Sequence, residues 1–141
     1  MNASLRNALN QYKAVGVNAS VEDATPHRLI QMLMEGALAR MAAAQGNMTR
    51  GEVGPKGENV SLAISIIGGL QGCLDQERGG EVAENLDRLY DYMARRLLEA
   101  NAENDPAKLT EVQRLLAEVK SGWDAIPAEH HNPRSGPKAG A

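Results

Sequence analysis

The chain has 141 residues, 43% of them hydrophobic, and its formal net charge at pH 7 is −3. This length suits one domain with its own core, and the apolar fraction excludes an intrinsically disordered chain. Acidic and basic residues are interleaved without a basic patch, and three Tyr, one Trp and no Phe offer few stacking platforms, so nucleic-acid binding is not expected.

The sequence also predicts where the protein works. Cys73 is its only cysteine, so an internal disulfide is impossible, which fits a reducing compartment. The N-terminal sequence MNASLRNALNQYK lacks the apolar core of a signal peptide. The longest uncharged apolar stretch, 60–74, is too short for a membrane span. We expect a soluble cytoplasmic protein without membrane insertion, in which Cys73 is a buried, inert thiol.

Residues 1–24 are predicted to form an arm ahead of the first long helix. Within this arm, Leu5, Leu9 and Tyr12 lie on one face of a short amphipathic stretch over residues 3–15. A helix of this length is only marginally stable alone in water. We therefore expect the arm to dock on the rest of the chain.

The first long helix is predicted to begin at Pro26, with Thr25 as its N-cap, and to end between Gly46 and Arg50. Its apolar residues cover more than the ~100° stripe that a bundle helix normally buries. They are Leu29, Ile30, Leu33, Met34, Ala37, Leu38, Met41, Ala44 and Met48. The surplus must be covered by another part of the chain or by a partner protein, so this apolar arc is where we expect the function.

Glycines and one proline over 46–57 predict a loop, followed by a second helix over 58–74. Small residues recur along one face of this second helix. They are Ser61, Ser65, Gly68 and Gly72. Each glycine inside a helix costs about 0.5–1 kcal/mol relative to alanine, so something should approach this face closely. It either packs inside the bundle or forms a groove for a partner helix.

A turn over 75–80 is predicted to lead into a third helix over 81–102. The residues expected to face inward from this helix are Val82, Leu86, Leu89, Met93, Leu97 and Ala100. Asp105 is a predicted N-cap for a fourth helix that begins at Pro106. The fourth helix has one narrow apolar seam, formed by Leu109, Val112, Leu116, Val119, Trp123 and Ile126. We interpret Trp123 as a structural anchor in that seam and not as a ligand contact.

Short loops and the lack of any strand pattern favour antiparallel neighbours. The predicted fold is all-α: an antiparallel four-helix bundle with a short N-terminal helical arm. It forms a single domain over 1–126, and the tail over 127–141, with three Pro and two Gly, is expected to be disordered.

Enzyme and metal-carrier interpretations lack the residues they need. Glu52 stands where a phosphate-binding loop starting at Gly46 would require lysine. His130 and His131 fall in the predicted tail without further ligands, and His27 is interpreted as a surface histidine. No Glu-x-x-His pair exists for a di-iron bundle. No enzyme activity, cofactor or metal is predicted.

Several strings are similar to those of a known family. ATPHRLIQMLMEGAL (24–38), GGEVAENLDRLYDYM (79–93), RRLLEAN (95–101) and EVQRLLAEVKSGWDAI (111–126) resemble the flagellar secretion chaperone family FliS, and Tyr12 also fits. The resemblance covers Tyr12 to Ile126. It implies a cytoplasmic, non-enzymatic helical bundle that binds the C-terminal segment of flagellin. Such a chaperone prevents premature polymerisation and assists delivery to the type III export gate.

The arc, the small-residue face and the resemblance together predict the partner-binding residues. They are Tyr12, Leu29, Leu33, Ser61, Ser65, Gly68 and Gly72. Besides flagellin, the flagellar export gate and an anti-sigma factor are candidate partners. The alternative is a helical adaptor for another flagellar regulator, such as an anti-sigma factor or a second export chaperone. The arm is expected to dock on the exposed apolar arc near Leu29 and Leu33 or on the small-residue face, and to be displaced by the partner.

Overall fold

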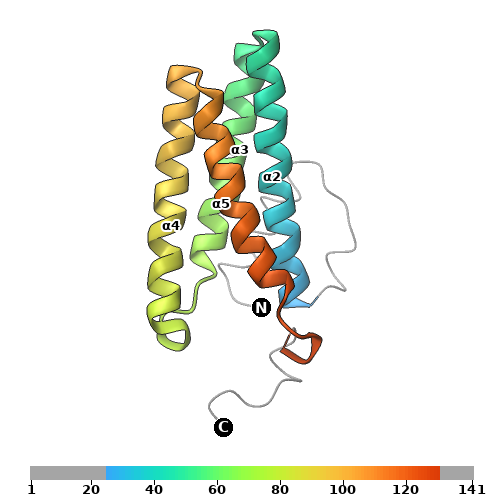
Figure 1. Ribbon diagram of the computed structural model, residues 1–141, viewed down its shortest axis with the longest axis vertical. Coiled ribbons are helices and arrows are strands. Elements are labelled where there is room, and N and C mark those ends of the chain that lie inside the picture. Colours follow the sequence, from blue (N-terminus) through green and yellow to red (C-terminus); the bar gives the residue numbers. More distant parts are fainter. Residues whose placement is uncertain (1–24, 131–141) are drawn as a thin grey trace.

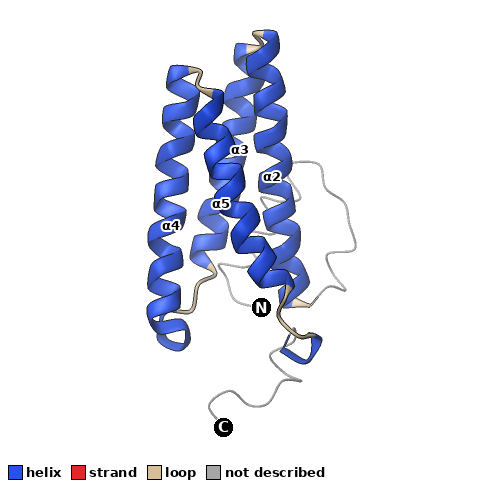
Figure 2. Cartoon of the chain, in the orientation of Figure 1, coloured by secondary structure: helices blue, strands red, loops and turns tan. Residues whose placement is uncertain are grey.

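The computed structural model describes residues 25–130, which form four long helices and one short 3-10 helix. The long helices are α2 (Pro26–Arg50), α3 (Val53–Gly72), α4 (Gln76–Glu103) and α5 (Pro106–Asp124), and the 3-10 helix is η2 (Ala128–His130). The long helices run alternately up and down, and no strand occurs between residues 25 and 130 (Figures 1 and 2). The predicted all-α bundle is confirmed.

The four helices form a closed ring around one core. α3 packs against α2 and α4, and α5 packs against the same two helices from the other side. The start of α2, the end of α3, the start of α4 and the end of α5 therefore meet at one end of the bundle (Figure 1). The predicted arm, 1–24, and residues 131–141 of the predicted tail lie outside the described residues; η2 forms in the first part of that tail.

The helix starts follow the predicted caps. Thr25 Oγ1 accepts a hydrogen bond from the Arg28 amide at 3.1 Å, and Asp105 Oδ1 accepts one from the Ala107 amide at 2.9 Å. Each side chain satisfies a first-turn amide that has no carbonyl partner inside its helix.

The predicted loop over 46–57 is wrong, because only Gly51 and Glu52 separate α2 from α3. Gly51 takes a left-handed conformation, φ 72°, and its amide closes the end of α2 on the carbonyls of Asn47 and Met48. Pro55 falls in the first turn of α3, where helix amides have no intrahelical acceptor, so its missing N–H costs nothing. Glycine and proline here begin a helix, although their composition suggested a loop.

The wide apolar arc of α2 is absorbed by the core. Leu29 and Leu33 are 0% exposed, so the prediction that they lie on an exposed arc is wrong. The physical reason is that α2 packs against two neighbours, α3 and α5, and each covers one side of the arc.

The inward face of α4 also differs from the prediction near its start. Val82 is 66% exposed and Leu86 and Leu89 are half-buried, whereas Ala83 and Tyr90 are buried. Met93, Leu97 and Ala100 are buried as predicted. The spacing placed Val82 inward, but no described helix covers it at this end of α4.

Candidate functional site

An apolar groove of about 380 Å³ opens at the end of the bundle where α2 and α4 begin. Ile30 and Met34 of α2 and Leu70 of α3 contribute to its lining. The α4 side is formed by Val82, Ala83, Leu86 and Tyr90, and the α5 side by Val119 and Trp123. The remaining wall is formed by Cys73, Leu74, Asp75, Arg78 and Gly79, of which Asp75 and Arg78 are charged. All four long helices thus contribute to one cavity.

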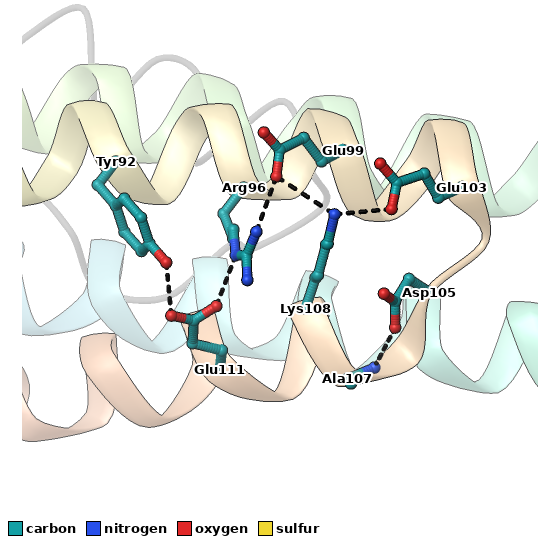
Figure 3. A network of polar contacts seen from close by, with 8 residues as sticks. All are labelled: Tyr92, Arg96, Glu99, Glu103, Asp105, Ala107, Lys108 and Glu111. Atoms are coloured by element: carbon teal, nitrogen blue, oxygen red, sulfur yellow. Dashed lines mark hydrogen bonds and ion pairs between the residues drawn. The ribbon is translucent and has the colours of Figure 1, made fainter.

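The groove exists because α5 lies beside α4 along its first part and beside α2 along its last part. Figure 1 shows α5 beside the far end of α4 where it begins and over the start of α2 where it ends. At the far end the two helices are joined by Glu111, whose Oε2 accepts a hydrogen bond from Tyr92 Oη and whose Oε1 accepts one from Arg96 Nε, both at 2.6 Å (Figure 3). At the groove end α5 follows α2, which leaves the first turns of α4 uncovered.

The α4–α5 polar network keeps the opposite end closed. Lys108 Nζ donates to Glu103 at 2.6 Å and to Glu99 at 3.4 Å, and Arg96 also pairs with Glu99 (Figure 3). The hydroxyl of Tyr92 and then the guanidinium of Arg96 lower the pKa of Glu111. Exposed ion pairs are individually weak, so the network's main effect is to fix which part of α5 pairs with α4.

His27 and Trp123 form a clasp between the start of α2 and the end of α5. Trp123 Nε1 donates to the His27 carbonyl at 2.9 Å, and His27 Nε2 donates to the Trp123 carbonyl at 2.7 Å. The two rings stack with centroids 4.9 Å apart and an interplanar angle of 6°. His27 is only 4% exposed, so its interpretation as a surface histidine is wrong. Trp123 has the anchoring contacts expected of it, and it also lines the groove.

Two groove residues with titratable side chains, Cys73 and Tyr90, lie in an environment of low polarity. Burial raises the pKa of the Cys73 thiol to about 11 and that of the Tyr90 hydroxyl to about 12. Cys73 is half-buried rather than fully buried, but its thiol stays protonated near neutral pH, as expected of an inert cysteine. The part of the wall formed by Cys73 and Tyr90 is uncharged near neutral pH and suits apolar side chains of a ligand.

The structure separates the residues that the sequence grouped as partner-binding. Tyr12 lies outside the described residues. Leu29 and Leu33 are core residues that do not line the groove, although their neighbours Ile30 and Met34 do.

The small-residue face of α3 is exposed: Ser61, Ser65, Gly68 and Gly72. A Cβ added to Gly68 would meet no described atom within 4 Å, so this face does not pack inside the bundle. Leu70, which lines the groove, is two residues from Gly68 and therefore about 200° around the helix. The α3 face and the groove are two distinct surfaces.

Sequence analysis missed most groove residues. Val82 and Leu86 fit a core seam by spacing, and Tyr90 fell outside it; only the course of α5 leaves this part of α4 open. Across residues 25–130, no group of three or more His, Cys, Asp or Glu could hold a metal ion. None of the described helices combines the length and apolar character needed to cross a membrane.

Comparison with known proteins identifies the family. The family model described as flagellar protein FliS matches residues 8–130. A flagellar secretion chaperone FliSB of Pseudomonas aeruginosa is 58% identical over 119 residues, which are 84% of this chain and 94% of the relative. The flagellar secretion chaperone FliS of Vibrio cholerae is 43% identical over 128 residues, 91% of this chain and 94% of the relative. That of Salmonella typhimurium is 46% identical over 119 residues, 84% and 88% of the two chains. The chain therefore belongs to the FliS family of flagellar secretion chaperones.

Proposed function

We propose that this export chaperone binds the C-terminal segment of flagellin in the cytoplasm, prevents its premature polymerisation and assists its delivery to the flagellar type III export gate. The observation that carries the proposal is an open apolar groove in a chain of the FliS family. Binding alone performs this task, and the proposal includes no catalytic step.

The groove suits an amphipathic helix. Such a helix inserts apolar anchors at i, i+3 or i+4, and i+7 into a channel between helices. Here the walls are Val82 and Leu86 on α4 and Val119 and Trp123 on α5, with Ile30 in the lining from α2. A segment that is disordered when free loses conformational entropy on binding, which moderates affinity and keeps release possible.

The α3 face supplies a second contact surface for the same segment. Ser61, Ser65, Gly68 and Gly72 present little side-chain bulk, so a partner helix can approach the α3 backbone closely. A long flexible segment can reach both the groove and this face by wrapping around the bundle. In this proposal Leu29 and Leu33 support the groove from the core, and Tyr12 contacts the partner as the family resemblance implies.

Val82 and Val53 allow a matched test of the groove. Both valines are exposed, 66% and 71%, but Val82 lines the groove and Val53 begins α3 at the other end of the bundle. Val82→Asp should weaken flagellin binding at least about tenfold, because a carboxylate would be buried against apolar anchors. Val53→Asp should bind like the wild type.

Calorimetric titration measures the affinity for intact flagellin and for flagellin lacking its C-terminal segment. Unchanged affinity for the truncated flagellin would refute the proposal as a whole. Equal losses in Val82→Asp and Val53→Asp would instead place the binding site away from the groove.

The separation of the α3 face from the groove favours one alternative function. With two surfaces, the chain could act as an adaptor for another flagellar regulator, such as an anti-sigma factor or a second export chaperone. Titrating a purified anti-sigma factor into the chaperone, with and without the flagellin segment, distinguishes the two. Binding of the anti-sigma factor with no binding of flagellin would favour the adaptor.

A further inference from the structure

Residues 73–79, here called the strap, connect the end of α3 to the main part of α4 and form one wall of the groove. Cys73, Leu74, Asp75, Arg78 and Gly79 all line it. The strap lies between two breaks in helical geometry: α3 ends at Gly72, and α4 is interrupted at Gly80. Figures 1 and 2 show the short connection between α3 and α4 at this end of the bundle. One groove wall is therefore a short segment with a break on each side.

Gly80 is the sharper of the two breaks. Its backbone has φ 50° and ψ −125°, a conformation that side chains with a Cβ rarely adopt and that glycine tolerates. The turn before it and the helix after it are thus separate pieces of α4 joined at one non-helical residue. Gly79 is also required, since an added Cβ would lie 2.6 Å from the Ala83 Cβ.

The strap is weakly tied to the rest of the bundle. Its hydrogen bonds outside the regular helix pattern are local: Cys73 N to Leu70 O, Leu74 N to Gln71 O, and Gly79 N to Asp75 O. The Arg78 amide donates to Asp75 Oδ1, and the ion pair between these side chains is exposed at 3.8 Å. Among the described residues, the apolar packing of Cys73 and Leu74 joins the strap to the core.

The connection between α4 and α5, by contrast, is held in place by hydrogen bonds to a distant part of the chain. There the buried Lys56 donates from Nζ to the Asn101 carbonyl at 3.0 Å and to Asn104 Oδ1 at 3.1 Å. These bonds tie the connection to α3, a neighbouring helix far away in the sequence. The strap has no such bond to a distant part of the described chain, so its displacement breaks no long-range polar contact between residues 25 and 130.

We propose that the strap is a hinged wall that swings about Gly80, widening the groove to admit or release a partner segment and closing over it once bound. This inference rests on the proposed function, because it describes how the groove is regulated. Opening breaks the local packing of Cys73 and Leu74 while the four-helix core stays intact, which is the usual behaviour of a lid on a rigid scaffold.

Hydrogen exchange in the free wild-type chain tests the hinge without any partner. The hydrogen-bonded amides of Cys73, Leu74 and Gly79 should exchange at least about 100-fold faster than those of Met93 and Leu97, with a weak urea dependence, because local opening exposes little surface. Equal rates and equal urea dependence at both sets of amides would overturn the proposal.

Gly80→Ala tests the role of the hinge residue, with Gly57→Ala as its control. Alanine at residue 80 disfavours the observed backbone and should drive the strap away from the groove, so labelling of the single thiol, Cys73, should accelerate at least about tenfold. Gly57 has a normal helical position and no atom within 4 Å of an added Cβ, so its variant should label like the wild type. Equal labelling in both variants would refute the hinge; should Gly80→Ala fail to fold, exchange in the wild type decides.

The bound state separates this proposal from the proposed function. With the flagellin C-terminal segment bound, exchange at Cys73 and Gly79 should slow at least about tenfold as the strap closes. Binding without any slowing would overturn the hinged wall. Absence of binding would count against the proposed function, and strap motion would still be judged from exchange in the free chain.

Discussion

The clasp between His27 and Trp123 predicts a large, measurable loss of stability when the indole is removed. Truncating a fully buried Trp to Ala costs about 3–5 kcal/mol. Trp123 is only partly buried, which reduces that figure, but the variant also loses the Nε1 hydrogen bond to the His27 carbonyl and the stacked ring pair. A hydrogen bond contributes about 1 kcal/mol and a stacked pair about 0.5–1.5 kcal/mol. We expect Trp123→Ala to lose about 3 kcal/mol.

Urea denaturation followed by circular dichroism measures this loss directly. For a chain of this size, about 3 kcal/mol corresponds to a fall in melting temperature of roughly 10 °C. Trp123→Phe is the control, because phenylalanine keeps a ring against His27 but cannot donate to its carbonyl; it should lose about 1–2 kcal/mol. Trp123→Ala with wild-type stability would refute the anchoring role, and would leave Trp123 as a wall of the groove only.

Three further predictions test other parts of the structure. Gly68→Ala should raise the free energy of unfolding by about 0.5–1 kcal/mol, since the site is helical and open; a loss of stability would mean that something packs there. The pKa of Glu111 is lower in the folded state than in the unfolded state. Its contribution to stability is therefore present above the unfolded pKa of about 4.3 and is lost as pH falls through the folded pKa. Glu111→Gln should consequently show a smaller acid-induced loss of stability in that interval. Deleting residues 1–11 should leave flagellin affinity intact or raise it while promoting aggregation of the free chaperone, and arm amides that became more protected on binding would show that the arm is a clamp.

The sequence by itself determined the helices and their order. Caps such as Thr25 and Asp105 act within one turn, so their residue types alone locate helix starts. The family strings likewise pointed to the FliS family, independently of any packing. Local information failed where composition was ambiguous: glycines and Pro55 suggested a loop after Gly46, but the left-handed Gly51 ends α2 in a turn of only two residues.

Only the tertiary structure decided which apolar residues are buried and which are available to a partner. Leu29 and Leu33 looked like surplus surface because one helix cannot reveal how many neighbours will cover it; α3 and α5 cover both sides. Val82 looked like core for the same reason, and the departure of α5 toward α2 leaves it exposed in a groove. His27 became buried through a contact with Trp123, 96 residues away. Periodicity fixes the face of a helix on which a residue lies, but burial depends on the neighbour that packs against that face.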